Sequence, residues 1–143
     1  MKITKQKKLL LLIDEILQEE TEFRINLRML QIDDSTLYEA HRECRRKFIY
    51  DPKHEKLHKS HEKVFNKYHQ FIKQHKLLVK HCVTLLDQLK SNCYNPVRYL
   101  EDELMLTAGL KKTKDDHNLI LDELKTVRKE HFDYLTPQQK KKQ

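Results

Sequence analysis

The chain has 143 residues, with one glycine, three prolines and 36% charged residues. This composition excludes a hairpin-rich fold, because tight hairpins depend on glycine-containing turns, and the length suits one domain with one core. The net charge of +7 equals the number of lysines at the two ends: Lys2, Lys5, Lys7, Lys8, Lys140, Lys141 and Lys142. The body is therefore formally neutral, which argues against nucleic-acid binding. The basic ends predict weak contact with an anionic membrane surface.

The first two predicted helices cover residues 3–31 and 36–49. The first has an apolar stripe at three- and four-residue steps: Leu9, Ile13, Ile16 or Leu17, Phe23, Leu27 and Leu30. Residues 33–36 predict a break, since Thr36 with Glu39 has the spacing of a capping box. The stripe of the second helix is Leu37, Ala40, Cys44 and Phe48. This helix should end at Asp51-Pro52, because the residue before proline avoids the helical conformation.

The third predicted helix, residues 53–90, is the longest and has alternating three- and four-residue spacing. Its seam is Leu57, His61, Val64, Tyr68, Phe71, His75, Leu78, Cys82, Leu85 and Leu89. Asn95-Pro96 predicts the start of a fourth helix. Its expected inner stripe is Val97, Leu100, Leu104 and Ala108, with fraying near Gly109. A fifth helix begins after residues 113–116, ends at Pro137 and packs through His117, Ile120 or Leu121, Leu124, Val127, His131 and Leu135.

These elements predict an all-α, up-and-down bundle of four to five helices with one long central helix. We expect a single bundle over residues 1–136 and a disordered basic tail at 137–143. Cys44, Cys82 and Cys93 have no CxxC spacing, which favours a reducing compartment and a cytoplasmic location. The apolar run after the basic start is too short for a signal peptide, and the sequence contains no transmembrane stretch.

Nine histidines raise the question of a metal site. Glu55-x-x-His58 has the spacing of di-iron bundles, but such sites use this unit twice, with two further glutamates. We therefore predict no metal ion and no cofactor. We interpret His61, His75, His117 and His131 as helix-packing residues, and His54 and His58 as exposed. With no nucleophile–base arrangement and no glycine-rich loop, the sequence predicts no catalytic residues and favours a protein that is not an enzyme.

Glu20 falls in the middle of the first apolar stripe. A carboxylate there is costly when it is buried without a partner. It either reaches the rim or pairs with a lysine of the third helix, or this stretch is uncovered and Glu20 faces another molecule.

Residues 15–30 resemble the opening segment of Dbl homology domains, the helical exchange factors of Rho-family GTPases. Glu20, Phe23, Leu27 and Leu30 follow the family's order of glutamate, aromatic residue and two leucines. A second similar segment contains Phe65-Asn66, His75 and Leu77-Leu78. A third contains Leu104-Met105-Leu106, Leu110-Lys111-Lys112-Thr113 and His117, with Arg98 where the family has an arginine.

The chain also departs from this family pattern. Val97 replaces the family's glutamine, and Asp102 stands at its tyrosine position. The stretch between the second and third segments is shorter than in a complete domain by at least one helix.

The resemblance implies that Glu20 contacts the first switch of a GTPase and Lys111 the second switch region. The candidate partner-binding residues are Glu20, Phe23, Arg98, Lys111 and Lys112. We therefore expect a small helical protein-interaction module that binds a small GTPase in the manner of a reduced exchange-factor domain, with at most nucleotide exchange as an activity. The alternative is a structural or adaptor bundle without enzymatic activity that self-associates or binds a partner helix.

Overall fold

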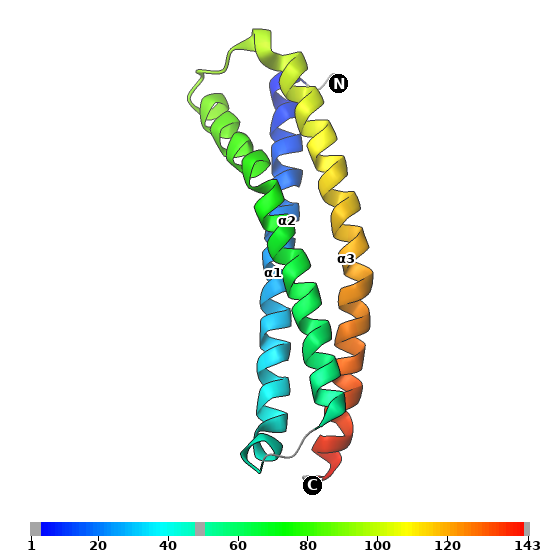
Figure 1. Cartoon of the computed structure of the whole chain (residues 1–143). Helices are drawn as coiled ribbons and strands as arrows, with labels where there is room; N and C mark the ends of the chain where they lie inside the picture. Colours follow the sequence, from blue (N-terminus) through cyan, green and yellow to red (C-terminus); the bar gives the residue numbers. More distant parts are fainter. Residues whose placement is uncertain (1–3, 48–50, 142–143) are drawn as a thin grey trace. The chain divides into compact units, whose positions relative to one another are not determined.

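A computed structural model describes residues 4–47 and 51–141, with the backbone alone at 43–45 and 137–141. These residues form three α-helices, α1 (Lys5–Arg46), α2 (Pro52–Lys90) and α3 (Tyr99–Lys141), with a short 3₁₀ turn, η1 (Pro96–Arg98), before α3 (Figure 1). No strand occurs among them. The all-α prediction is confirmed. The expectation of four to five helices with one long central helix is wrong, because the three helices have 42, 39 and 43 residues.

The predicted break at residues 33–36 is absent, and α1 is continuous through it. The Thr36 hydroxyl donates to the Asp33 carbonyl at 2.8 Å, so it bonds to the preceding turn and does not cap a new helix. Leu30 and Leu37 are both fully buried and lie two turns apart on one face. Packing of this continuous stripe favours helix through a segment whose local residues favour a turn.

Both ends of α2 have side-chain or backbone caps. At its start, Asp51 Oδ1 accepts a hydrogen bond of 3.0 Å from the backbone N–H of Lys53, with proline in the first helical position. At its end, Asn92 has a φ of 57° and the N–H of Cys93 donates to the Gln88 carbonyl at 2.9 Å. This is a Schellman arrangement. Asparagine adopts the left-handed conformation that the motif requires more readily than most residues do.

The predicted fourth and fifth helices are one helix, α3, which also continues through Pro137 to Lys141. Its buried positions recur at steps of three or four residues: Tyr99, Asp102, Leu106, Leu110, Thr113, His117, Ile120, Leu124, Val127 and His131. The predicted inner stripe is wrong, since its four members are exposed: Val97, Leu100, Leu104 and Ala108.

The predicted fraying near Gly109 is absent, because α3 is continuous through this residue. One glycine costs a helix only about 1 kcal/mol relative to alanine, and here it lets α3 approach Leu78 of α2. A Cβ atom at Gly109 would lie 2.8 Å from both terminal methyl carbons of Leu78.

The chain forms two compact units, and each helix contributes a segment to both. Unit 1 comprises Met1–Phe23 and Gln70–Asn118, and unit 2 comprises Arg24–His69 and Leu119–Gln143. Within each unit, α1 runs parallel to α3 and antiparallel to α2. In unit 1 this order follows from the contacts Lys8–Glu103, Glu15–Lys114, His75–Asp116 and His81–Asp102. In unit 2 it follows from Asp33–Arg128, Thr36–His131, Asp34–His58 and Lys67–Glu123.

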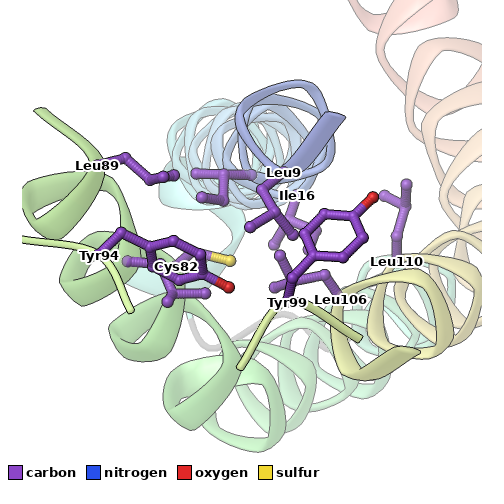
Figure 2. Close-up of a cluster of buried hydrophobic side chains, with 10 residues drawn as sticks. Leu9, Ile16, Cys82, Leu89, Tyr94, Tyr99, Leu106 and Leu110 are labelled. Atoms are coloured by element: carbon purple, nitrogen blue, oxygen red, sulfur yellow. The ribbon is translucent and has the colours of Figure 1, made fainter. Parts of the chain in front are cut away.

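The core of unit 1 draws on all three helices and on the α2–α3 connection (Figure 2). Its buried members are Leu9, Ile13, Ile16, Cys82, Leu85, Leu89, Tyr94, Tyr99, Leu106 and Leu110. Cys82 is fully buried, as predicted, and burial raises the pKa of its thiol to about 11. The side chain of Cys44 lies outside the described residues.

Unit 2 combines apolar and histidine side chains in its interior. The buried residues are Leu27, Leu30, Leu37, His41, Leu57, His61, Val64, Tyr68, Ile120, Leu124, Val127 and His131. Burial raises the pKa of Tyr68 to about 12, partly offset by a hydrogen bond with Asn26. The prediction that His61 and His131 pack between helices is confirmed, as it is for His75 and His117 in unit 1.

Among the described helices, none contains an apolar stretch long enough to cross a bilayer.

Candidate functional site

The five residues predicted to bind a partner all belong to unit 1. Arg98, Lys111 and Lys112 are exposed. Glu20 is half-buried and already takes part in a polar or electrostatic interaction within the protein. A partner that binds the Glu20 carboxylate must therefore compete with that interaction.

Phe23 is fully buried, as expected from its place in the apolar stripe. Its ring centroid lies 6.2 Å from that of Phe71, 6.0 Å from that of His75 and 4.3 Å from that of His117. The contact with His117 is edge-on, a favoured aromatic geometry. Phe23 therefore supports the interior of unit 1 and presents no surface to a partner.

A row of apolar side chains is exposed on η1 and the first part of α3. Val97, Leu100 and Leu104 have exposed fractions of 88%, 71% and 73%, and Ala108 is also exposed. Their spacing of three, four and four residues places them along one side of the helix. We call these four residues the outer stripe. Single exposed apolar residues are ordinary, but a contiguous row of them is typical of an interaction surface.

Basic residues stand at both ends of the outer stripe. Arg98 directly follows Val97, and Lys111 lies three residues after Ala108 on the same helical face, with Lys112 beside it. An acidic and apolar partner surface would match this arrangement.

A second constellation in unit 1 brings two acids of α1 to a histidine of α3. His117 Nδ1 lies 3.1 Å from Glu19 Oε2 and 4.0 Å from Glu22 Oε2. The His117 side chain is 3% exposed, that of Glu19 17% and that of Glu22 63%. We call these three residues the acid–histidine cluster. The burial of His117 was predictable from its place in the apolar stripe, whereas no sequence pattern pointed to its contacts with Glu19 and Glu22.

His75 also neighbours Phe23, and it contacts two polar groups of α3. Its Nδ1 is 3.2 Å from Thr113 Oγ1, and its Nε2 is 3.5 Å from Asp116. Because the Thr113 hydroxyl donates its hydrogen to the Gly109 carbonyl at 2.7 Å, Nδ1 of His75 is inferred to carry the proton. Burial lowers the pKa of His75, and Asp116 partly opposes this effect.

Asp102 is a fully buried carboxylate on the seam of α3. Its Oδ2 accepts a hydrogen bond of 2.7 Å from the Tyr94 hydroxyl, and its Oδ1 lies 3.5 Å from His81 Nε2. Burial and the neighbouring carboxylate raise the pKa of Tyr94. These contacts join α2, α3 and the connection between them, so we assign Asp102 a structural role.

Unit 2 contains its own histidine–aspartate contacts. Asp34 Oδ1 lies 3.2 Å from Nδ1 of both His58 and His61. His41 lies 3.7 Å from Asp51, and its ring stacks on His54 with a centroid distance of 3.9 Å. His58 is exposed as predicted, but His54 is half-buried because of this stack.

Two shallow surface depressions also lie in unit 2. One, of about 340 Å³, is lined by Lys53, Lys56, Leu57, Glu130, Asp133 and Tyr134. The other, of about 320 Å³, is lined by Ser60, Lys63, Val64, Asp122, Glu123, Thr126, Val127 and Glu130. Neither lining contains a histidine or a cysteine.

Comparisons with protein-family models, with curated proteins and with solved structures found no match for this chain. The fold and the surface of unit 1 define the class as an all-α protein with long helices, histidine-rich interiors and an exposed apolar row.

Proposed function

We propose that the protein is a helical interaction module that docks a protein partner on the outer stripe of unit 1. The exposure of Val97, Leu100 and Leu104 carries this proposal. When a partner surface covers these side chains, burial of their apolar area stabilises the complex by about 25 cal/mol per Å².

The charges beside the outer stripe favour a partner with an apolar centre and an acidic rim. Arg98 and Lys111 lie at opposite ends of the row, so they can fix the direction in which a partner lies along it. Charge complementarity of this kind contributes more to specificity and association rate than to affinity.

We propose a small GTPase as the partner, bound in the manner of a reduced exchange-factor domain. The support is the resemblance to Dbl homology segments, together with the exposure of Arg98, Lys111 and Lys112. The same resemblance assigns Lys111 to the second switch region. Glu20 would reach the first switch only after leaving its present interaction.

The decisive experiment compares two leucine substitutions in unit 1. Leu104→Glu places a charge within the outer stripe, whereas Leu77→Glu changes an equally exposed leucine of α2, outside the stripe, as a matched control. Binding of purified nucleotide-free small GTPases is measured by biolayer interferometry. We expect Leu104→Glu to weaken binding more than tenfold and Leu77→Glu to leave it within twofold.

A Glu20→Ala variant tests the part of the proposal that comes from the resemblance. Binding should be lost while the helical circular dichroism is unchanged. If the unaltered protein binds no GTPase, or if Leu104→Glu binds as well as the control, the GTPase proposal is wrong.

Self-association through the outer stripe is the alternative. It predicts a mass by light scattering that rises with protein concentration and returns to the monomer mass in Leu104→Glu.

A further inference from the structure

The acid–histidine cluster (Glu19, Glu22 and His117) has the composition of a metal-binding site. Each residue offers one ligand atom, and these atoms lie within 4.8 Å of one another. Glu19 and Glu22 are three residues apart on α1, so their side chains share a helix face, while His117 comes from α3. All three belong to unit 1.

Two carboxylates and one imidazole converge at this cluster. Two carboxylates this close repel each other, and the repulsion is stronger near a buried group than in water. A proton on His117 Nδ1 forms a hydrogen bond with Glu19 at 3.1 Å, but Glu22 at 4.0 Å is beyond hydrogen-bond distance. A divalent cation between the three groups would interact with both carboxylates.

The neighbouring residues fix the histidine and leave one acid adjustable. The edge-on contact with Phe23, with the rings 4.3 Å apart, restricts the orientation of the His117 ring. Lys114, one turn before His117, lies 3.4 Å from Glu15. Glu22 is 63% exposed, so it can change rotamer at little cost and leaves room for coordinating water.

We infer that Glu19, Glu22 and His117 form a binding site for a divalent transition-metal ion, with Zn²⁺ as the best match. Zinc binds imidazole nitrogen at about 2.0–2.1 Å and carboxylate oxygen at about 2.0–2.2 Å, which places two tetrahedral ligand atoms about 3.3–3.5 Å apart. The distance of 3.1 Å between His117 Nδ1 and Glu19 Oε2 is already near this separation. Glu22 Oε2, at 4.0 Å, must move closer to His117 Nδ1 by roughly half an ångström. An imidazole ligand disfavours Mg²⁺ and Ca²⁺, which prefer oxygen.

Such a site has three protein ligands and leaves at least one position for water. It joins α1 to α3 within unit 1, so metal binding stabilises the folded state by linkage. This inference is independent of the outer stripe and of its partner.

Other histidines of the chain provide matched controls. His75 faces Thr113 and the single carboxylate of Asp116, so it lacks a second acid ligand. His54 and His58 stand four residues apart on α2 and can chelate added metal adventitiously.

The test is isothermal titration of Zn²⁺ into the full chain at pH 7, with thermal unfolding recorded with and without zinc. We expect a saturable site that weakens at least tenfold in His117→Gln and in Glu22→Gln, and that is unchanged in His75→Gln and His58→Gln. Cu²⁺ electron paramagnetic resonance should show nitrogen coupling that is reduced in His117→Gln.

Three outcomes overturn the inference: no saturable zinc binding, zinc binding that survives both ligand substitutions, or binding lost only in His58→Gln. Should His117→Gln fail to fold, Glu22→Gln decides the matter, because that side chain is mostly exposed and its loss should not unfold the protein.

Discussion

The phenol of Tyr94, in the connection between α2 and α3, donates a hydrogen bond of 2.7 Å to the fully buried carboxylate of Asp102. Removal of the hydroxyl leaves part of this carboxylate unsatisfied in the interior. Tyr94→Phe should therefore lower the free energy of unfolding by about 1.5–3 kcal/mol, the range for a hydrogen bond to a charged group.

Urea denaturation followed by circular dichroism measures this loss. The matched control is Tyr134→Phe, which removes a hydrogen bond of 2.8 Å to the less buried Asp51. A larger loss in the control than in Tyr94→Phe would contradict the importance assigned to Asp102.

Acidification should weaken the protein through His75 and His131. Burial lowers the pKa of both below the ordinary value of 6.5. The unfolded chain therefore takes up these protons at a higher pH than the folded chain does. Their contribution to stability is complete above pH 6.5 and decreases as the pH falls from there towards the folded-state pKa.

The charged neighbours determine how strong this pH effect is. Asp116 opposes the shift of His75, and Lys112 reinforces it. At His131, Asp33 and Asp34 oppose the shift, whereas His61 and Arg128 reinforce it. Urea midpoints at pH 7.5 and 5.5 should differ less in His131→Gln than in the unaltered protein. An equal or larger difference in the variant would show that His131 does not contribute.

The thiols of Cys82 and Cys93 should react at very different rates. Cys93 is exposed, whereas Cys82 is buried and its thiol has a pKa of about 11. Because the thiolate is the reactive form, Ellman's reagent should modify Cys93 within minutes and Cys82 only on unfolding. A Cys44→Ser background isolates the two, and Cys93→Ser in that background should remove the fast phase. Persistence of that phase would place a reactive thiol elsewhere.

Gly109→Ala should change stability little, because two effects oppose each other. Alanine gains about 1 kcal/mol in helix propensity, but its Cβ atom would lie 2.8 Å from the Leu78 methyl groups, which must shift. In a Leu78→Ala background the clash disappears, so the same substitution should stabilise by about 1 kcal/mol. A double-mutant cycle measures this coupling. The absence of coupling would exclude the close approach.

The inner faces of α1 and α2 were predictable from sequence. Ile13, Phe23 and Leu30 on α1, and Val64, Tyr68 and Cys82 on α2, are buried as their spacing indicates. Regular repetition over several turns makes such a pattern unambiguous. The Asn95 cap was also predicted correctly, since it depends on a local hydrogen bond of 3.1 Å that the Val97 N–H donates to Asn95 Oδ1.

The register of α3 was not predictable in the same way. Two stripes compete in its first three turns, one with Leu100 and Leu104 and one with Tyr99, Asp102 and Leu106. The first is more apolar, but only the second continues at three- and four-residue steps to His117. The second stripe was hard to recognise because it contains Asp102. Burial of a carboxylate is costly unless polar groups such as Tyr94 and His81 contact it.

The sequence by itself determined that this protein is helical and which faces of α1 and α2 are buried, because periodicity and capping are local properties. Only the tertiary structure decided that the described residues form three α-helices, that the outer stripe is exposed, and that Glu19 and Glu22 meet His117. Those features depend on contacts between residues up to about a hundred positions apart, whose pairing is set by how neighbouring helices align and not by the residues around them.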